Sequence, residues 1–164
     1  ISVVAVPLQT AGKLSALLSR RQARDLFDCS NLFRLGGLDR ERLRLAFVVY
    51  GAMSRTDWRT IALKDVDVDT ADLEQKLIPT LRSAGSEYIR KDQFGKGLVE
   101  DCRNLLASLL PFTAPDQEFL DRILDMGEIA PELLTGDEAL QNRIRRHPLL
   151  ELKAVNVRSH KKGS

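Results

Sequence analysis

Hydrophobic side chains recur at helical spacing along most of the chain, and this pattern predicts a mainly α-helical protein. Leu14, Leu17 and Leu18 form the first apolar stripe. The run Leu43–Tyr50 is apolar on almost every side, so we expect its helix at the centre of a bundle. A strongly amphipathic helix is expected over Leu98–Leu110, ending before the proline that follows.

Capping signals predict where several helices begin and end. Ser19-Arg-Arg-Gln22 has the form of a capping box, so a second helix is expected to start at Ser19. This helix runs to Leu35, where Gly36-Gly37 stops it. Asp39 is a favourable N-cap for a third helix that reaches about Ala52. A break in the chain direction is therefore expected near Ser19.

The second half of the chain is predicted to be helical with interruptions. A helix from about Thr70 contains Pro79, which bends or interrupts it. The polar stretch 83–97 contains several glycines and is expected to be a loop with at most one turn of structure.

The last helices are predicted from similar signals. One helix is expected from Pro115 to Gly127, and Thr135-Gly-Asp-Glu138 is a second capping box that opens a helix ending at His147. A final apolar segment spans residues 149–155, and the tail 158–164 is expected to be disordered.

The first seven residues, Ile1–Pro7, have the apolar character of a β-strand. A single strand has no partner in a helical protein, and unpaired strand backbone is costly when it is buried. The strand therefore pairs either with another molecule or with a sheet that lies upstream in a longer polypeptide, and we favour the second. The predicted fold is a helical bundle with one N-terminal strand, divided into a helical domain, residues 1–157, and a basic disordered tail, residues 158–164.

Composition indicates one ordinary globular domain, because 43% of the 164 residues are hydrophobic and 29% are charged. The net charge of +2 hardly favours nucleic acid as a partner of the whole chain. Basic residues cluster, however, so local phosphate-binding patches compete with the simpler interpretation of solvated helix faces. The clusters are Arg20, Arg21 and Arg24; Arg143, Arg145 and Arg146; and Lys161 and Lys162.

Cysteine usage and hydropathy favour a cytoplasmic protein. Cys29 and Cys102 occur without CxxC spacing or a neighbouring histidine, which argues against both a zinc site and a disulfide framework. No apolar run approaches the roughly 20 residues that span a bilayer, and no signal peptide is visible. We expect no membrane partner.

Lys13 and the segment Arg20–Asp28 carry the candidate chemistry. A lysine among leucines is most often a surface side chain that extends to solvent, but it can also provide a positive charge for a nucleotide phosphate. Asp25 and Asp28 lie three residues apart and share a helix face. In one interpretation they form surface ion pairs with Arg21 and Arg24, which lie four residues before each of them. In the other, a carboxylate helps to hold Mg²⁺ or takes a proton from an attacking hydroxyl, while the arginines contact phosphate.

A shared site depends on the predicted break. On one straight helix Lys13 and Asp25 would lie about 18 Å apart, too far to contact one ligand. A reversal near Ser19 would bring them together.

Alternating aspartates in Asp65-Val-Asp-Val-Asp69 resemble a two-metal motif, but no Gly-Ser turn precedes them. We interpret them as a solvated polar edge that also caps the next helix. The sequence contains no plausible Ser-His-Asp or Cys-His arrangement and no Gly-rich phosphate loop.

Two stretches resemble the AbiEii/AbiGii family of nucleotidyltransferase toxins. The first combines Lys13-Leu-Ser-Ala-Leu17 with Arg24-Asp-Leu-Phe-Asp28, and is similar to the family's A-E-K-L-x-A-L and R-D-L-[YF]-D blocks, with Gly12 in place of the glutamate. The second runs from Glu118-Phe-Leu-Asp121 through Gly127–Thr135 to Val157 and resembles the family's C-terminal signature. Both occur in order across nearly the whole chain.

The resemblance implies a bacterial, Mg²⁺-dependent enzyme that transfers a nucleotide from an NTP to an acceptor, tRNA in characterised relatives. The family's conserved lysine falls on Lys13, and its later catalytic aspartate falls on Asp25 or Asp28, with Asp25 preferred. Arg21 and Arg24 would join Lys13 in binding phosphate. An antitoxin encoded by a neighbouring gene would be a further partner.

The resemblance covers only the C-terminal part of such an enzyme. The family's Gly-Ser…Asp-x-Asp metal motif is absent, so we assign no metal ligand and expect this chain alone to be inactive. Ile1–Pro7 would be the last strand of the missing N-terminal nucleotidyltransferase sheet. The alternatives are a non-catalytic helical module that binds RNA or protein through its arginines, and an inert structural domain.

Overall fold

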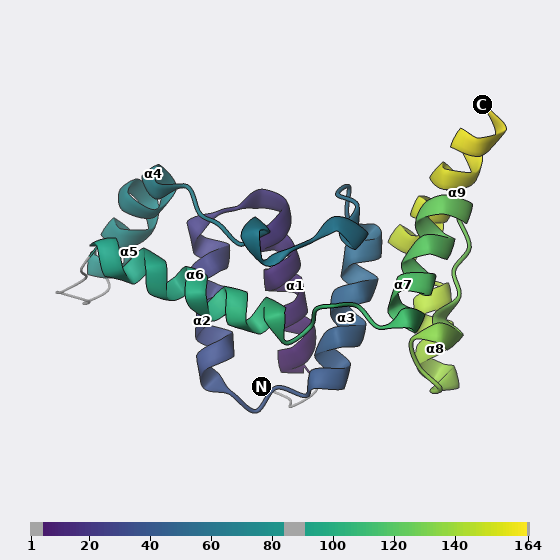
Figure 1. The fold of residues 1–164 in the computed structure, drawn as a ribbon, viewed down its shortest axis with the longest axis horizontal. Coiled ribbons are helices and arrows are strands. Elements are labelled where there is room, and N and C mark those ends of the chain that lie inside the picture. Colours follow the sequence, from purple (N-terminus) through teal and green to yellow (C-terminus); the bar gives the residue numbers. More distant parts are fainter. Residues whose placement is uncertain (1–4, 84–90, 164) are drawn as a thin grey trace.

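The computed structural model describes residues 5–83 and 91–163, and these residues form helices and turns without any β-strand. The predicted mainly α-helical fold is thereby confirmed. Figure 1 shows three neighbouring helices at the centre of the molecule, α1 (Ala5–Arg20), α2 (Ala23–Leu35) and α3 (Arg40–Met53). A fourth helix, α6 (Lys91–Ala107), crosses α2.

The remaining elements lie at the two ends of this central group (Figure 1). The first end holds α4 (Thr70–Asp72), the π-turn η3 (Leu73–Leu77) and α5 (Ile78–Ser83). The other end holds α7 (Ala114–Asp121), the π-turn η4 (Arg122–Met126), the 3-10 turn η5 (Pro131–Leu133), α8 (Glu138–Arg145) and α9 (Pro148–Lys162). Two 3-10 turns, η1 (Trp58–Thr60) and η2 (Leu63–Asp65), connect α3 to α4. Within residues 5–83 and 91–163, no helix is both long enough and apolar enough to cross a bilayer.

Helix α3 lies at the centre of the core, as its apolar run predicts. Leu43, Phe47 and Val48 are at most 1% exposed. The Phe47 ring lies 5.1 Å from the Trp58 ring and 6.1 Å from the Phe112 ring, measured between centroids. These rings join α3 to the turn that follows it and to the chain entering α7, so α3 connects the central helices to the C-terminal ones.

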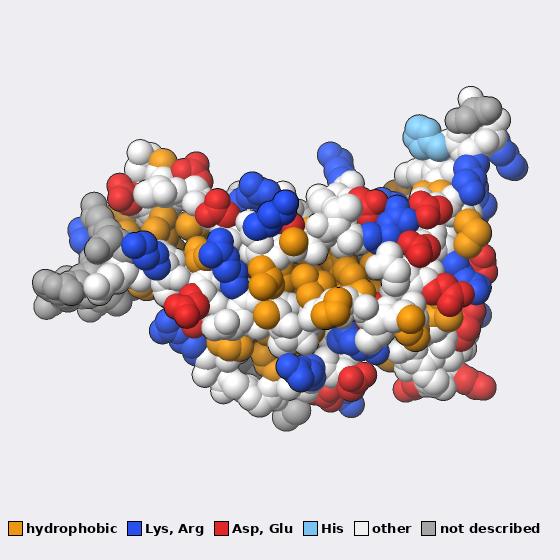
Figure 2. Space-filling view, in the orientation of Figure 1, with side chains coloured by type: hydrophobic (Ala, Val, Ile, Leu, Met, Phe, Trp, Pro, Cys, Tyr) orange, Lys and Arg blue, Asp and Glu red, His pale blue; other side chains and the backbone are white. Residues whose placement is uncertain are grey.

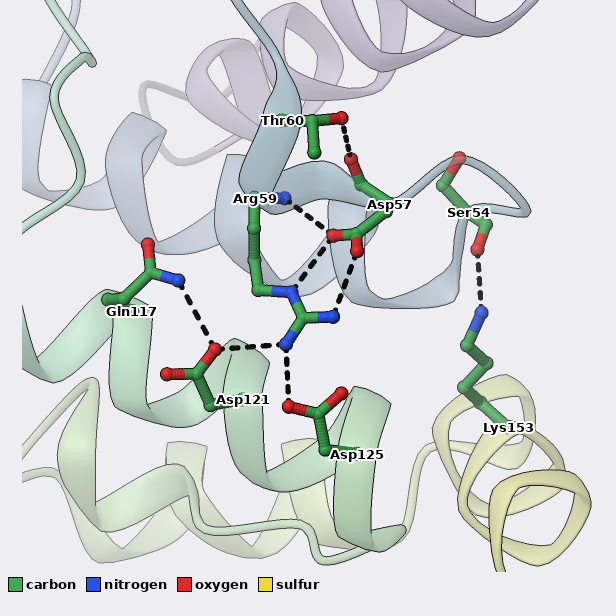
Figure 3. A network of polar contacts seen from close by, with 8 residues as sticks. All are labelled: Ser54, Asp57, Arg59, Thr60, Gln117, Asp121, Asp125 and Lys153. Atoms are coloured by element: carbon green, nitrogen blue, oxygen red, sulfur yellow. Dashed lines mark hydrogen bonds and ion pairs between the residues drawn. The ribbon is translucent and has the colours of Figure 1, made fainter. Parts of the chain in front are cut away.

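Polar contacts reinforce this junction (Figure 3). Arg59 donates to Asp57 on its own turn, to Asp121 at 3.0 Å and to Asp125 at 2.7 Å. Hydrogen bonds to three carboxylates, with the Asp57 bond as the largest cause, raise the pKa of Arg59, and the bond from Arg59 lowers the pKa of Asp57. Lys153 of α9 donates to the backbone oxygen of Ser54 at 2.9 Å. The loop after α3 is therefore connected to both α7–η4 and α9.

Several predicted boundaries are confirmed. Asp39 caps α3 by accepting from the Arg42 amide, and Gly36 and Gly37 follow α2 with φ of 68° and 66°. Gly127 ends η4 in the left-handed conformation. The helix that contains Pro79 is interrupted by the π-turn η3, because proline provides no amide for a regular α-helical hydrogen bond.

Other predicted boundaries are wrong. Ser19 lies inside α1, and α2 begins only at Ala23. Residues 91–97 belong to α6 rather than to a loop, while 84–90 lie outside the described residues. The helix expected from Thr135 is capped by Asp137, and Thr135 accepts a bond from the Asp137 amide.

The two chain ends also differ from prediction. Of the expected strand Ile1–Pro7, residues 1–4 lie outside the described residues, and Ala5 to Pro7 form the first turn of α1. The expected disordered tail 158–164 is helical as far as Lys162. Arg158 donates to the Gly127 oxygen at 2.5 Å, and this tertiary contact holds the helix beyond residue 157 against the domain.

Gly51 provides a sharp test of the core. A Cβ built on Gly51 would overlap the indole ring of Trp58, whereas a Cβ on Gly12 would meet no atom within 4 Å. We predict that Gly51→Ala lowers the free energy of unfolding by about 1–3 kcal/mol through overpacking. The matched change Gly12→Ala removes a glycine from α1 and should raise that free energy by about 0.5–1 kcal/mol. Urea denaturation measures both, and equal values for the two variants would contradict this packing.

Candidate active site

The chain reverses direction between α1 and α2, close to where the sequence predicts a break. α1 ends at Arg20, Arg21 adopts a left-handed φ of 54°, and α2 starts after Gln22. The predicted capping box does not cause this reversal, because Gln22 occupies the N-cap position and makes no side-chain cap bond. We call the Arg20–Ala23 segment the elbow.

A carboxylate from a distant element caps α2 instead. Asp72 of α4 accepts a hydrogen bond from the Ala23 amide at 2.8 Å and pairs with Lys76 at 2.6 Å. Both contacts lower the pKa of Asp72, with the Lys76 bond as the larger cause, and the same bond raises the pKa of Lys76. A negative charge at a helix N-terminus is stabilised by the unpaired amides there.

The reversal brings Lys13 against Asp28. The Lys13 Nζ atom lies 2.7 Å from Asp28 Oδ2, and the two side chains are 35% and 26% exposed. The sequence resemblance favours Asp25 as the functional carboxylate, but the carboxylate that contacts Lys13 is Asp28. Both groups of this ion pair are reachable from solvent.

Asp25 has a different environment. Its side chain is 5% exposed, and its two oxygens lie 3.1 and 3.0 Å from Nη2 of Arg20. Lys13 and Arg20 are seven residues apart and so share a face of α1, while Asp25 and Asp28 share a face of α2. The two ion pairs therefore both join α1 to α2, at successive levels along the hairpin.

The surface ion pairs predicted within α2 do not form. Arg21, expected to pair with Asp25, lies 4.0 Å from Asp65 of η2 instead. Asp28, expected to pair with Arg24, is bonded to Lys13. Arg24 is exposed, and within the described residues it makes no ion pair. The simplest explanation of this segment, local helix-surface pairing, is therefore wrong for both pairs.

Two adjoining clefts lie beside the elbow, where α4 and η3 approach it. The larger, about 460 Å³, is lined by Arg20, Arg21, Gln22, Asp69, Ala71, Asp72, Gln75 and Lys76. The smaller, about 260 Å³, is lined by Gln22, Ala23, Arg24, Asp72, Lys76, Leu77 and Thr80. Arg21 and Arg24, the predicted phosphate-binding arginines, thus each face a cleft at the elbow.

Asp72 and Lys76 also belong to the site, although no motif in the sequence predicts them there. Their four-residue spacing suggests an ion pair on a helix. Nothing in the sequence indicates that Asp72 also bonds the Ala23 amide, which lies 49 positions earlier in the chain.

The aspartates of Asp65-Val-Asp-Val-Asp69 act on the backbone. Asp65 accepts from the Ala62 amide, Asp67 from the Val68 amide and Asp69 from the Ala71 amide, each at 2.8 Å. The predicted helix cap at Asp69 is confirmed. Among the residues that the structure describes, no three His, Cys, Asp or Glu side chains are grouped so that they could hold a metal ion.

The Mg²⁺ ion that the sequence resemblance implies does not fit the described carboxylates of the hairpin. Asp25 and Asp28 are each bonded to a cation, through Arg20 and Lys13, and Mg²⁺ needs several free oxygen ligands in octahedral geometry. The hairpin is instead suited to present Lys13 and the elbow arginines to an anion.

A comparison with protein families identifies the chain. The model of the family described as nucleotidyl transferase AbiEii toxin, type IV TA system, matches residues 1–126. The chain therefore belongs to this family of nucleotidyltransferase toxins. The match spans α1 to η4 and includes the hairpin and the elbow. No curated protein and no solved structure matches the chain. The resemblance seen over Gly127–Val157 lies beyond the family match.

The charge on Asp72 should make stability depend on pH. Because the folded state lowers the pKa of Asp72, its stabilising contribution is present at neutral pH and is lost as the pH falls through that lowered value. We predict that Asp72→Asn lowers the free energy of unfolding by about 1 kcal/mol at pH 7. The difference from the unmodified protein should shrink below about pH 4.

Asp69→Asn is the matched control, because asparagine caps helices as well as aspartate does. Its unfolding free energy should stay near that of the unmodified protein across the same pH series. A deficit in Asp72→Asn that is independent of pH would show that the charge is not involved.

Proposed function

We propose that this chain acts in a cytoplasmic toxin that transfers a nucleotide from an NTP to an acceptor, tRNA, in a Mg²⁺-dependent reaction. The family membership supports nucleotidyl transfer, and the ion pair between Lys13 and Asp28 is the observation that carries the site assignment. The proposal assigns no Mg²⁺ ligand to the described residues.

Lys13 is the proposed phosphate-binding group. Its ammonium is a compact charge held at a fixed place by Asp28, and it lies on the same face of α1 as Arg20, which borders the elbow cleft. An incoming phosphate would share the ammonium with the Asp28 carboxylate. Arg21 and Arg24 add positive charge at the elbow, where they would neutralise the rest of the phosphate chain.

The two aspartates take different roles in this proposal. Asp25 is buried against Arg20, so its charge serves to hold the hairpin closed. Asp28 is partly exposed beside Lys13 and is the better placed to orient the lysine or to accept a proton from an attacking hydroxyl. We therefore shift the preference from Asp25 to Asp28 as the functional carboxylate.

Substitutions at the ion pair test this assignment. Lys13→Gln and Asp28→Asn in the polypeptide encoded by the complete open reading frame should each reduce nucleotide transfer by about 100-fold or more, as expected when a group that acts on the reacting phosphate is lost. Their melting temperatures should change by only a few degrees, because the pair is partly exposed. Labelled NTP and tRNA report the transfer.

Lys64→Gln is the matched control, since Lys64 is exposed and lies on η2. It should transfer label at the unmodified rate. If Lys13→Gln and Asp28→Asn transfer at that rate too, the site assignment is wrong, even if the polypeptide is an active transferase.

The 164-residue chain gives a second test. Incubated alone with Mg²⁺, labelled NTPs and tRNA, it should transfer no label, because the described residues contain no cluster that could hold the metal. Binding of tRNA without transfer by the complete polypeptide would instead favour the non-catalytic RNA-binding module. Robust transfer by the 164-residue chain would show that its own residues complete the active site.

A further inference from the structure

Helix α9 has one face in the core and a second, apolar face in solvent. Leu150 and Ala154 are at most 2% exposed, where α9 packs on η4 and α3. Leu149, Leu152 and Val155 are 55%, 56% and 49% exposed. These three side chains recur every third residue, so they follow one another along the helix. We call them the α9 stripe.

The chain around the α9 stripe is strongly basic. Residues 143–162 contain seven Lys and Arg residues and one acidic residue, Glu151, so their net charge is +6. Because the whole chain has a net charge of +2, the remaining residues carry −4. Some of these cations are engaged: Arg145 bonds Glu132, Lys153 bonds Ser54, and Arg158 bonds Gly127.

Cations without an ion pair lie beyond each end of the stripe. Among the residues that the structure describes, Arg143, Arg146, Lys161 and Lys162 make no ion pair. Arg146 lies two residues before the start of α9, and Lys161 and Lys162 are in its last turn. Figure 2 shows basic side chains gathered around the projecting C-terminal end of α9.

We propose that the α9 stripe docks an acidic, amphipathic helix of a partner protein. Apolar side chains at helical spacing pack into the grooves of another helix, and carboxylates near both ends of that helix would meet Arg146 and the Lys161–Lys162 pair. The charge complementarity selects an acidic partner, and Glu151 is the one residue of α9 that opposes it.

Other occupants fit this surface less well. RNA would satisfy the cations but leave three aliphatic side chains uncovered. A lipid surface usually needs a larger apolar face with aromatic anchors, and α9 has neither. A second copy of the chain, paired stripe to stripe, would bring two segments of charge +6 together. The stripe lies beyond Met126, outside the family match, so the proposal does not depend on nucleotidyl transfer.

A designed peptide tests the proposal without knowledge of the natural partner. The probe is a fluorescent helical peptide of about 20 residues with leucines along one face and glutamates on the flanks. One control peptide has the same composition with the leucines scattered around the helix, and another has lysine in place of every glutamate. Fluorescence anisotropy should show binding of the patterned acidic peptide alone, and binding should weaken as salt is raised.

Variants of the full chain locate the binding surface. Leu152→Glu should weaken binding by about tenfold or more, because it places a charge at the centre of the interface. The double change Lys161→Glu and Lys162→Glu should weaken it roughly fivefold. Lys64→Glu makes the same kind of change away from α9 and should leave binding unaltered. Leu152 is exposed, so circular dichroism should show unchanged melting of the Leu152→Glu variant.

Three results would overturn the proposal. Equal binding of the patterned and scattered peptides would show that no helical interface forms, and so would unaltered binding by Leu152→Glu. Light scattering that detects a dimer in the unmodified chain and a monomer in Leu152→Glu would assign the stripe to a second copy. Binding of RNA or anionic vesicles that Leu152→Glu abolishes, with no peptide binding, would assign it to those ligands.

Discussion

The reversal of the chain at Arg21 is the constraint on which the candidate site depends. Lys13 and Asp28 are 15 positions apart, and only a hairpin brings their charged groups within 2.7 Å. The reversal has a cost, because a non-glycine residue with a left-handed φ is disfavoured by about 1–2 kcal/mol. The surrounding structure offsets it. The Arg21 amide bonds the Leu17 oxygen at 2.8 Å, and Leu17 and Leu26 are fully buried in the hydrophobic core.

Electrostatic contacts hold the elbow from both sides. Within the hairpin, Arg20 neutralises the buried Asp25, and removing either partner would leave an unpaired charge beside the core. From outside, Asp72 caps α2 and Asp65 lies near Arg21. The segment that carries Asp65 and Asp72 therefore acts as a support for the hairpin. Its acidic character, which resembles a metal motif in the sequence, is explained by bonds to backbone amides and basic side chains.

Much of the fold could be predicted from the sequence because it depends on local rules. Helical periodicity identified the buried α3, and Asp39, Gly36-Gly37 and Gly127 marked boundaries through capping geometry that a few residues determine. The break near Ser19 was located within a few residues, although its cause was not the capping box.

The errors arose where tertiary contacts override local preference. Gly95 and Gly97 disfavour a helix, yet α6 includes both, because Gly95 lets Leu73 of η3 pack so closely that a Cβ there would lie 2.7 Å from it. In the site, whether Asp25 or Asp28 contacts Lys13 depends on the distance along α2 from the elbow to the level of Lys13. That offset is set by the turn at Arg21 and by the Asp72 cap, a contact across 49 residues that no sequence spacing encodes.

The hairpin and the α9 stripe lie in different parts of the molecule, which are joined through the core and through the polar contacts of the loop after α3. The family match ends at Met126, and the next residue, Gly127, is where α9 is attached: a side chain there would collide with the backbone of Ala154. Phe47 and Arg59 then link this C-terminal part to α3 and its following loop. Because α9 is held through its buried face, its exposed face is not needed for the fold. Leu149, Leu152 and Val155 are each about half exposed, so packing within the chain covers them only in part, and the proposed partner helix would cover the rest.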